Sequence, residues 1–419
     1  MKIGLICILL IAIITKETAA QQRCSSVEYQ QAQLQKDPSL QYKIRALETF
    51  TENSIKNKSH NVLSRLDGGF VIRIPVVVHI LYHDPSEDIS DSRVMEQIEA
   101  LNRDYRRMNA DTVNTPYYFK PVAADCNIEF HLATSDPKQR STTGIIRKYS
   151  PIKTWNEDDK MKFSSSFGDD AWDSQSYLNI WVCNINNVLG YSSFMGGPAN
   201  LDGVVINTSV FGQTGTIGSY DMGRTTVHEV GHWLSLIHLW GDTNCGDDLV
   251  ADTPKQSTFT VGCPSGIKIS CDNAPNGNMY MNYMDFTYDD CMNMFTQGQK
   301  ERMRTQFETG GFRYSILSSR GLDAPLIYEL PEIDYPPRWL YPQIFPNPAN
   351  NELTLDLSYD ARWLGKTVNL VNLQGQIVKQ ISVTSKIQKI DISRLSRGMY
   401  FLAAKRSDGE SIREKFVKQ

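Results

Sequence analysis

The chain has 419 residues, a formal net charge of −4 and 41% hydrophobic residues. This length predicts more than one domain. The slightly acidic balance, without a basic block or a base-stacking motif, argues against nucleic-acid binding. Beyond the first twenty residues, no segment is long and apolar enough to predict a transmembrane helix.

Residues 1–20 read as a secretory signal peptide. Lys2 precedes the apolar run IGLICILLIAII, and small residues precede the expected cleavage after Ala20. Residues 21–64 are polar and rich in Gln, Lys and Ser, so they read as a short prosegment rather than as a domain core. Ser64 and Arg65 offer a cleavage point just before the apolar core begins.

From Phe70 the sequence becomes strongly apolar, and its segments predict a sheet backed by a helix. The run VIRIPVVVHILY predicts a buried central strand, and CNIEFHLA, YLNIWVCNI and GVVIN predict further strands. Residues 92–108 place apolar side chains at helical spacing, which predicts an amphipathic helix against the sheet: Val94, Ile98, Leu101, Tyr105 and Met108.

The segment HEVGHWLSLIH, residues 228–238, contains three of the seven histidines of the chain. His228 and His232 are four residues apart, so on a helix both imidazoles project from one face and can bind one Zn²⁺. Glu229 can reach a metal-bound water without ligating the metal, and His238 joins the site if the chain turns after the helix. Three protein ligands leave the fourth position open, which is typical of a catalytic zinc site.

After about residue 310 the character of the sequence changes. Residues 316–341 are proline-rich and predict a linker. From Phe345, short alternating segments such as ELTLDL, TVNLVN and MYFLAAK are separated by Gly, Asn and Ser turns. This pattern predicts a small all-β, immunoglobulin-like sandwich over residues 342–419.

Several separated motifs resemble the pappalysin family of metzincin zinc metalloproteases, in family order: HEVGHWL, HLWGD, VADTP, NYMD and CMNMFTQGQ. The resemblance implies an α+β catalytic domain over residues 65–315, with a twisted mixed sheet, a zinc helix and a loop-rich C-terminal subdomain. It places Met284 in a methionine turn beneath the zinc. It also implies an edge strand that pairs with extended substrate, for which the segment around Gly190 and Tyr191 is the candidate.

The same resemblance assigns two further site residues. Cys24, in QQRCSS, corresponds to a cysteine switch, a thiolate that fills the open zinc position and keeps the enzyme latent. A cysteine in a mobile tail is the alternative. Asp290 corresponds to a carboxylate at the base of the S1′ pocket, which favours Arg or Lys at P1′, and a solvated loop aspartate is the alternative.

Eight cysteines and a secretory signal fit an oxidising compartment. Four of the cysteines cluster in the C-terminal half of the catalytic region, where the sequence alone allows three pairings. The family pattern implies two disulfides there, Cys245–Cys271 and Cys263–Cys291. Cys126 and Cys183 lie in apolar strand patterns and read as buried thiols, with a mutual bridge as the alternative.

The segment CGDDLVADTP combines carboxylates, a hydroxyl and carbonyls that can coordinate Ca²⁺. In relatives this loop binds calcium, and the matching ligands are Asp248, the carbonyl of Ala251 and Thr253. An acidic surface loop has the same appearance.

Two positions depart from the family pattern. Ser235 replaces a glycine at the end of the zinc helix, where the chain often needs positive φ, so we expect a strained but intact turn. Phe286 replaces a tyrosine that can donate a hydrogen bond to the tetrahedral intermediate in relatives. That function is then lost or passes to Tyr283 or Tyr288.

The last 75 or so residues resemble the C-terminal sorting domain of type IX secretion cargo, through FPNPANNELTLDL, NLQGQIVKQ, LSRGMYFL and the tail KFVKQ. The resemblance implies export by the type IX secretion machinery and a catalytic part that is secreted or anchored at the outer-membrane cell surface. A plain sandwich that binds carbohydrate or protein is the alternative.

The sequence therefore predicts a secreted, zinc-dependent endopeptidase that is made as a latent zymogen and hydrolyses proteins, with a preference for Arg or Lys at P1′. Glu229 acts as general base towards the attacking water and then as acid towards the leaving amine. The alternative is a surface adhesin on a metzincin scaffold with little or no catalysis, supported by Ser235 and Phe286 alone. The sequence does not identify the physiological substrate.

Overall fold

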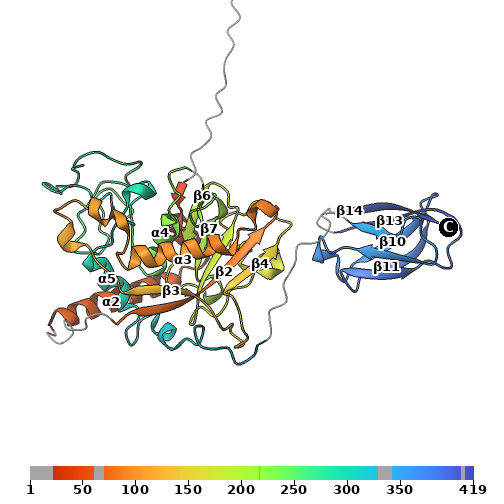
Figure 1. The fold of residues 1–419 in the computed structure, drawn as a ribbon, viewed down its shortest axis with the longest axis horizontal. Coiled ribbons are helices and arrows are strands. Elements are labelled where there is room, and N and C mark those ends of the chain that lie inside the picture. The colour runs from red at the N-terminus through yellow and green to blue at the C-terminus, as the bar shows by residue number, and fades with distance from the viewer. Residues whose placement is uncertain (1–21, 61–69, 217, 329–341, 407–410) are drawn as a thin grey trace, which may run out of the picture.

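The computed structural model describes residues 22–60, 70–216, 218–328, 342–406 and 411–419 (Figure 1). The predicted signal peptide and the expected cleavage point at Arg65 lie outside these residues. The helices of the described chain are α1 (Ser26–Lys36), α2 (Leu40–His60), α3 (Asp91–Tyr105), α4 (Arg224–Trp233) and α5 (Gln297–Thr305).

A seven-stranded mixed sheet forms the centre of the catalytic region, in the order β1-β6-β7-β5-β2-β3, with β4 pairing the second half of β2. Its strands are β1 (Gln22–Cys24), β2 (Ile72–Tyr82), β3 (Ile128–Leu132), β4 (Ile145–Tyr149), β5 (Leu178–Cys183), β6 (Val188–Ser192) and β7 (Val204–Asn207). Most neighbours are parallel, whereas β6 and β7 are antiparallel. The predicted strands and the predicted mixed sheet are confirmed.

The burial pattern explains the position of β2 in the middle of the sheet. Ten of its eleven residues are buried, because both faces of the sheet are covered. On one face α3 and α4 pack against the strands, with Val94, Leu101 and Tyr105 of α3 in the main core. The opposite face is covered by a second cluster that includes Trp181 and Tyr191.

The helix α4 ends in a Schellman motif that turns the chain back toward the sheet. Leu236 N donates to Gly231 O at 2.9 Å, and Ser235 N donates to His232 O at 2.9 Å. Ser235 has a φ of +75°, the left-handed value expected at this position from the sequence. A non-glycine residue there costs about 1 kcal/mol, which the buried turn tolerates.

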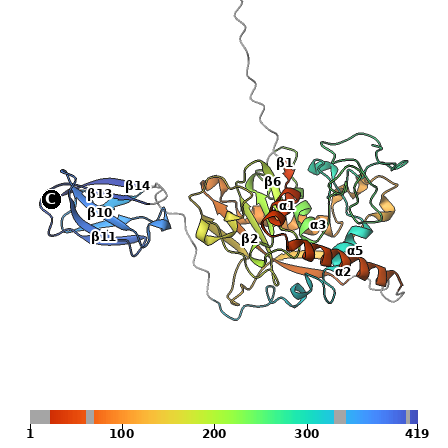
Figure 2. The same ribbon diagram turned by 180° about the vertical axis from the view of Figure 1, so that it is seen from behind.

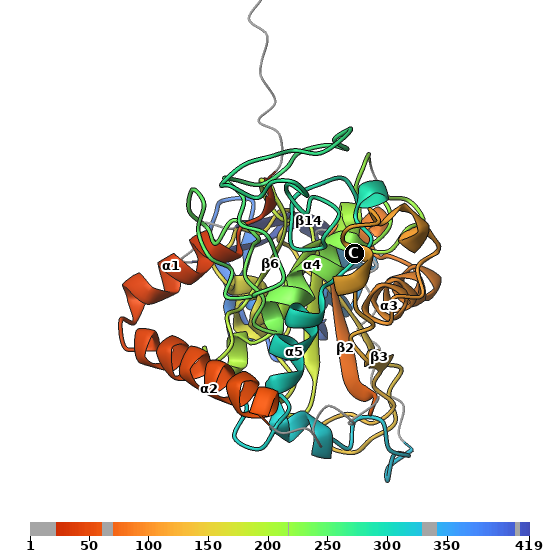
Figure 3. The ribbon, with the colours of Figure 1, turned by 90° about the vertical axis from the view of Figure 1, so that its left-hand side faces the viewer.

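The segment before the catalytic region is more ordered than its polar composition predicts. It contributes the edge strand β1 and the helices α1 and α2, which lie along one side of the molecule (Figure 3). The helix α2 packs against α5, where Glu48 pairs with Arg302 at 2.6 Å and Gln306 Nε2 donates to Thr51 at 2.9 Å. Because these contacts are polar, the helices of this segment show little of the apolar periodicity from which a helix is predicted.

The chain between α4 and α5 is rich in loops and forms a subdomain that carries two disulfides. Cys245 bonds to Cys271, and Cys263 bonds to Cys291. These are the pairs that the family pattern implies. Cys126 and Cys183 are free and buried, so they do not form the mutual bridge that was the alternative.

Part of the expected linker belongs to the catalytic region instead. The backbone of Gly321 accepts hydrogen bonds from the amides of Thr134 and Ser135, and Ser141 N donates to Ile327 O at 2.7 Å. Residues 316–328 therefore pack along the catalytic region, which corrects the predicted linker start. Proline content alone did not indicate this packing.

The C-terminal residues form the predicted all-β sandwich (Figure 2). One sheet has the order β11-β10-β13-β14 and the other β12-β9-β8, all antiparallel. The strands are β8 (Gln343–Phe345), β9 (Glu352–Asp356), β10 (Thr367–Asn372), β11 (Ile377–Ser382), β12 (Ile387–Asp391), β13 (Gly398–Lys405) and β14 (Ser411–Lys418). Within the described residues, no helix has the length and hydropathy of a membrane span.

Candidate active site

Three histidines converge on one point beneath the sheet edge. The Nε2 atoms of His228, His232 and His238 lie 3.0 to 3.2 Å from one another. His228 and His232 come from one face of α4, and His238 is brought back by the turn after it. His228 is buried completely and His238 almost completely.

The hydrogen-bond partners of the three Nδ1 atoms show that the Nε2 atoms face the centre of the histidine cluster. His228 Nδ1 lies 2.7 Å from Tyr283 O, and His232 Nδ1 lies 2.8 Å from Leu236 O. His238 Nδ1 lies 2.6 Å from Asp242 Oδ1. Carbonyl and carboxylate oxygens only accept, so each Nδ1 carries the proton and each Nε2 directs a lone pair inward.

This donor set fits a divalent cation. Three lone pairs that point at one another repel unless a cation lies between them, and nitrogens around a tetrahedral Zn²⁺ are roughly 3.3 Å apart. Burial lowers the pKa of His232 to about 3 and that of His228 well below its ordinary value. These two imidazoles are thus neutral, the form that binds metal.

Cys24 completes the cluster from the opposite side. Its Sγ and the three histidine nitrogens all lie within 4.8 Å of one another, and its side chain is 1% exposed. The strand β1 carries it there by pairing in parallel with β6, with Cys24 opposite Gly190. The edge strand expected around Gly190 and Tyr191 is therefore occupied by the prosegment.

Glu229 lies beside this cluster, fully buried in α4. Its Oε2 accepts a hydrogen bond from Ser26 Oγ at 2.8 Å and lies 3.5 Å from Cys24 Sγ. Burial raises the pKa of Glu229 to about 8. A Cβ on Gly190 would lie 3.1 Å from Glu229 Cγ, so a glycine at this rim position leaves room for the carboxylate. The sequence did not identify Ser26, because a serine in a polar segment has no distinctive pattern.

Met284 lies directly beneath α4, as the methionine turn predicts. A Cβ on Gly231 would approach Met284 Sδ to 2.6 Å, so only glycine allows this contact between helix and turn. The preceding residue, Tyr283, supplies the carbonyl that orients His228.

Phe286, one of the two departures from the family pattern, packs against the histidine cluster. Phe286 packs edge-on against His238, with ring centroids 5.0 Å apart. Tyr283 is fully buried with its ring against Phe295, and Tyr288 stacks edge-on with Tyr220.

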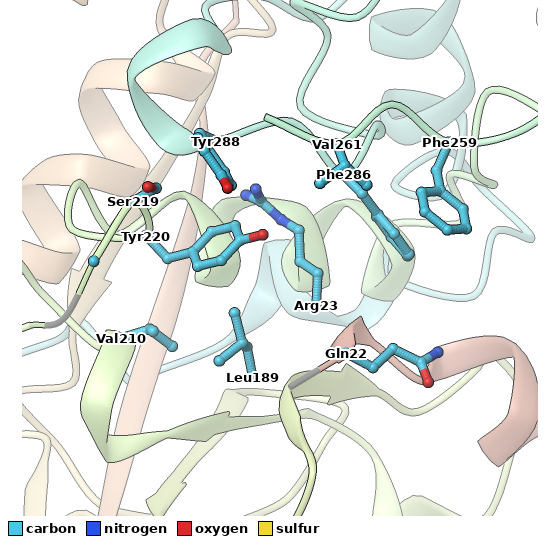
Figure 4. A pocket seen from close by; sticks show the side chains of 11 residues that line it. Gln22, Arg23, Leu189, Val210, Ser219, Tyr220, Phe259, Val261, Phe286 and Tyr288 are labelled. Carbon is cyan, nitrogen blue, oxygen red and sulfur yellow. The ribbon is translucent and has the colours of Figure 1, made fainter. Parts of the chain in front are cut away.

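A cavity of about 800 Å³ opens beside the cluster, and the side chain of Arg23 enters it from β1 (Figure 4). Leu189, Val210, Tyr220, Phe286 and Tyr288 are among its lining residues.

The guanidinium of Arg23 is held at the end of this cavity. It lies 3.0 Å from Asp289 Oδ1, bonds to the carbonyl of Thr287, and stands 4.9 Å from the ring centroid of Tyr220. Both members of the ion pair are almost completely buried. The cavity therefore accommodates a basic side chain.

The buried carboxylate that pairs with Arg23 is Asp289, and not Asp290, the residue expected at this place from the sequence. Asp290 is exposed, and its carboxylate lies beside the disulfide sulfur of Cys263. The short 3-10 turn Asp289–Cys291 rotates the first aspartate inward and the second outward. The two residues are adjacent and chemically identical, so motif alignment alone does not tell which of them is buried.

A buried charge network fixes Asp289. Its Oδ2 accepts from the amides of Met222 and Arg224, both at 3.1 Å. The fully buried Arg224 side chain pairs with Asp104 at 3.1 Å and with Asp111 at 2.7 Å. Sequence analysis did not identify these residues, since Asp104 and Arg224 lie inside helices where a charged residue usually faces solvent.

The expected calcium loop is closed by its own hydrogen bonds. Thr253 Oγ1 donates to both oxygens of Asp248 at 2.8 Å, and Val250 N donates to Asp248 Oδ1. Burial raises the pKa of Asp248 to about 7. Ala251 is exposed on the same loop. Calcium binding by Asp248, Ala251 and Thr253 stays a prediction.

Comparison with known proteins identifies two families. Residues 162–308 match the family described as pregnancy-associated plasma protein-A, a peptidase family, and residues 343–419 match the secretion system C-terminal sorting domain. An extracellular metalloprotease of Arthroderma gypseum is 30% identical over 316 residues, covering 72% of this chain and 89% of the relative. One from Pyricularia oryzae is 41% identical over 248 residues, covering 56% and 75%.

Solved structures give the same result. A mirolysin complex with a small compound is 49% identical, covers 59% of this chain and 96% of that chain, and has a TM-score of 0.58. A promirolysin mutant of Tannerella forsythia is 43% identical, covers 71% and 97%, and has a TM-score of 0.63. The chain is an extracellular metalloprotease that belongs to the pappalysin family, the peptidases related to pregnancy-associated plasma protein-A, and it carries a C-terminal secretion sorting domain.

Proposed function

We propose that the protein is a zinc endopeptidase made as a latent zymogen, and that it cleaves peptide bonds on the N-terminal side of Arg or Lys. The observation that carries this proposal is the convergence of three imidazoles beside a buried glutamate, with a prosegment thiol facing them. His228, His232 and His238 hold Zn²⁺, and Glu229 is the general base.

Zn²⁺ supplies Lewis-acid polarisation of the scissile carbonyl and lowers the pKa of water. Glu229 takes the proton of the attacking water through Oε2, the oxygen that Ser26 holds in the zymogen. The same carboxyl then donates that proton to the leaving amine. Burial raises the pKa of Glu229 to about 8, which favours a carboxyl that holds the proton between the two steps.

Latency follows from what the prosegment places in the site. Cys24 Sγ, and not a peptide carbonyl, faces the three histidines, and β1 blocks the edge strand β6. Ser26 binds the catalytic carboxyl, and Arg23 lines the neighbouring cavity and pairs with Asp289. The likeness to promirolysin, a proenzyme by its name, supports a zymogen with Cys24 as its switch.

The P1′ preference rests on Arg23. Its guanidinium lies at the wall of the cavity and pairs with the buried Asp289, and charge-assisted contacts of this kind favour a basic side chain. A substrate Arg or Lys takes the same place once the prosegment has left.

The C-terminal sorting domain makes the type IX secretion machinery the partner for export.

The zymogen activated by limited trypsin treatment tests the proposal. It should hydrolyse protein and peptides with Arg at P1′, contain one zinc per chain, and lose activity with a chelator. Glu229→Gln should retain zinc and lose turnover. Turnover that survives in Glu229→Gln removes Glu229 from the mechanism, and a wild-type protein without turnover favours the adhesin alternative.

A further inference from the structure

The three histidines of the cluster differ in what holds their outer nitrogens. His228 and His232 each donate to a neutral backbone carbonyl, whereas His238 donates to the carboxylate of Asp242 at 2.6 Å. Asp242 is the only charged group in direct contact with the outer nitrogen of these three rings, among the described residues. A carboxylate behind an imidazole raises its basicity and fixes its tautomer and orientation.

The backbone is shaped to deliver this carboxylate. Gly241 and Asp242 have consecutive left-handed φ values of +58° and +57°. Two such residues in a row are costly for a non-glycine side chain at the second position. Gly241 N donates to His238 O at 2.8 Å and closes the turn, and a Cβ at Gly241 would lie 2.2 Å from Asp247 N.

The ring of His238 is also held on its face. Trp240 stacks on it with centroids 4.3 Å apart and an interplanar angle of 7°. Phe286 contacts it edge-on from the other direction. His238 is the ligand that stands outside α4, so its position depends on these neighbours and on Asp242, not on helix geometry.

We propose that Asp242 is the positioning residue of the metal centre: it makes His238 the strongest of the three donors and sets the affinity for Zn²⁺. The proposal rests on the zinc site proposed above. Asp242 does not touch substrate or the reacting atoms, so its effect reaches catalysis only through His238.

Asp242→Asn and Asp242→Ala test this assignment. The amide oxygen of Asn still accepts from His238 Nδ1, so this variant removes the charge and keeps the hydrogen bond, whereas Ala removes both. All variants carry Glu229→Gln, which keeps the full chain intact. Zn²⁺ affinity is measured by competition with a chelating dye. We expect a loss of roughly tenfold for Asn and up to roughly a hundredfold for Ala.

Asp247→Asn is the matched control, because Asp247 is an exposed aspartate of the same loop whose carboxylate contacts Lys255 and Leu249 N and no histidine. It should bind Zn²⁺ like the parent. The absorption spectrum of the Co²⁺-substituted chain gives a second readout, since a displaced His238 alters the ligand field. The melting temperature of the metal-free chain should change little in Asp242→Asn.

Zinc affinity and Co²⁺ spectra of both Asp242 variants equal to those of the parent would overturn the inference. So would a variant whose only defect is a lower melting temperature of the metal-free form, because that result assigns Asp242 to the loop and not to the metal. A parent chain that binds no stoichiometric zinc would instead refute the proposed function itself.

Discussion

Ser26 Oγ lies 2.8 Å from Glu229 Oε2 and accepts a hydrogen bond from Ser192 N at the same distance. One prosegment hydroxyl therefore occupies both the catalytic carboxylate and a backbone donor of the edge strand β6. Two residues earlier, Cys24 faces the three histidines. The prosegment thus blocks the histidine cluster through Cys24 and the catalytic Glu229 through Ser26, by two separate contacts.

We predict that Ser26→Ala weakens latency while Cys24 stays in place. Removing this donor from the buried carboxyl costs about 1 to 3 kcal/mol, so prosegment binding should weaken by roughly tenfold or more. Conversion of the purified zymogen, followed by gel electrophoresis and peptide hydrolysis, should be correspondingly faster. Ser39→Ala serves as control, since Ser39 is exposed and bonds only to Asp37. Equal conversion rates for the two variants would mean that Ser26 does not contribute to latency.

The second prediction separates the two adjacent aspartates. In Asp289→Asn the amide oxygen still accepts from the backbone amides of Met222 and Arg224, so the pocket keeps its shape and loses its charge. We expect kcat/KM for peptides with Arg at P1′ to fall by roughly tenfold to a hundredfold relative to peptides with Leu there. Asp290→Asn should leave the profile unchanged. The reverse result would restore the original sequence assignment to Asp290.

The sequence predicted the elements that have a repeating apolar pattern and the site residues that belong to a motif of defined chemistry. The alternation and length of apolar runs located β2, β5 and β7, and the spacing of Val94, Ile98 and Leu101 located α3. The HEVGH spacing placed His228 and His232 on one face of α4, and the secreted cysteine pattern was consistent with the two disulfides.

The elements and side-chain orientations that depend on tertiary contacts were not predicted from the sequence. The helices α1 and α2 are held mainly by polar anchors: Tyr29 Oη and Gln33 Nε2 both donate to Asp159, and Glu48 pairs with Arg302. None of these contacts produces hydrophobic periodicity, so the helices of the prosegment were not predicted. The choice between Asp289 and Asp290 depends on a single 3-10 turn, which no local pattern encodes.

The third prediction concerns the contact between α4 and the methionine turn. Gly231→Ala places a methyl group 2.6 Å from Met284 Sδ, so either the buried Met284 side chain or the helix must shift. Overpacking of this kind costs about 1 to 3 kcal/mol. We expect a lower melting temperature together with weaker Zn²⁺ binding, measured by thermal denaturation and chelator competition. In the double variant with Met284→Ala, the loss of stability should be smaller than the sum of the two single losses, because the truncated side chain relieves the overlap. A single Gly231→Ala variant with unchanged stability would show that the turn adapts freely.

The fourth prediction tests the calcium loop through the pH dependence of stability. Burial raises the pKa of Asp248 to about 7, above its ordinary value of 3.8 in the unfolded chain. The folded state therefore favours the protonated carboxyl, and stability should decrease as pH rises from about 4 to 7. Asp248→Asn cannot ionise, so its melting temperature relative to the wild type should rise across this window, both measured in the Glu229→Gln background without calcium.

Calcium should reverse this difference. A Ca²⁺ ion beside Asp248 stabilises the ionised carboxylate, so added calcium should raise the melting temperature of the wild-type chain at pH 7 and higher, and raise that of Asp248→Asn much less. Added Mg²⁺ is the control for general ionic effects. If calcium leaves the wild-type melting temperature unchanged, the hydrogen bonds from Thr253 and Val250 are the whole function of Asp248, and the loop is an acidic turn without a cation.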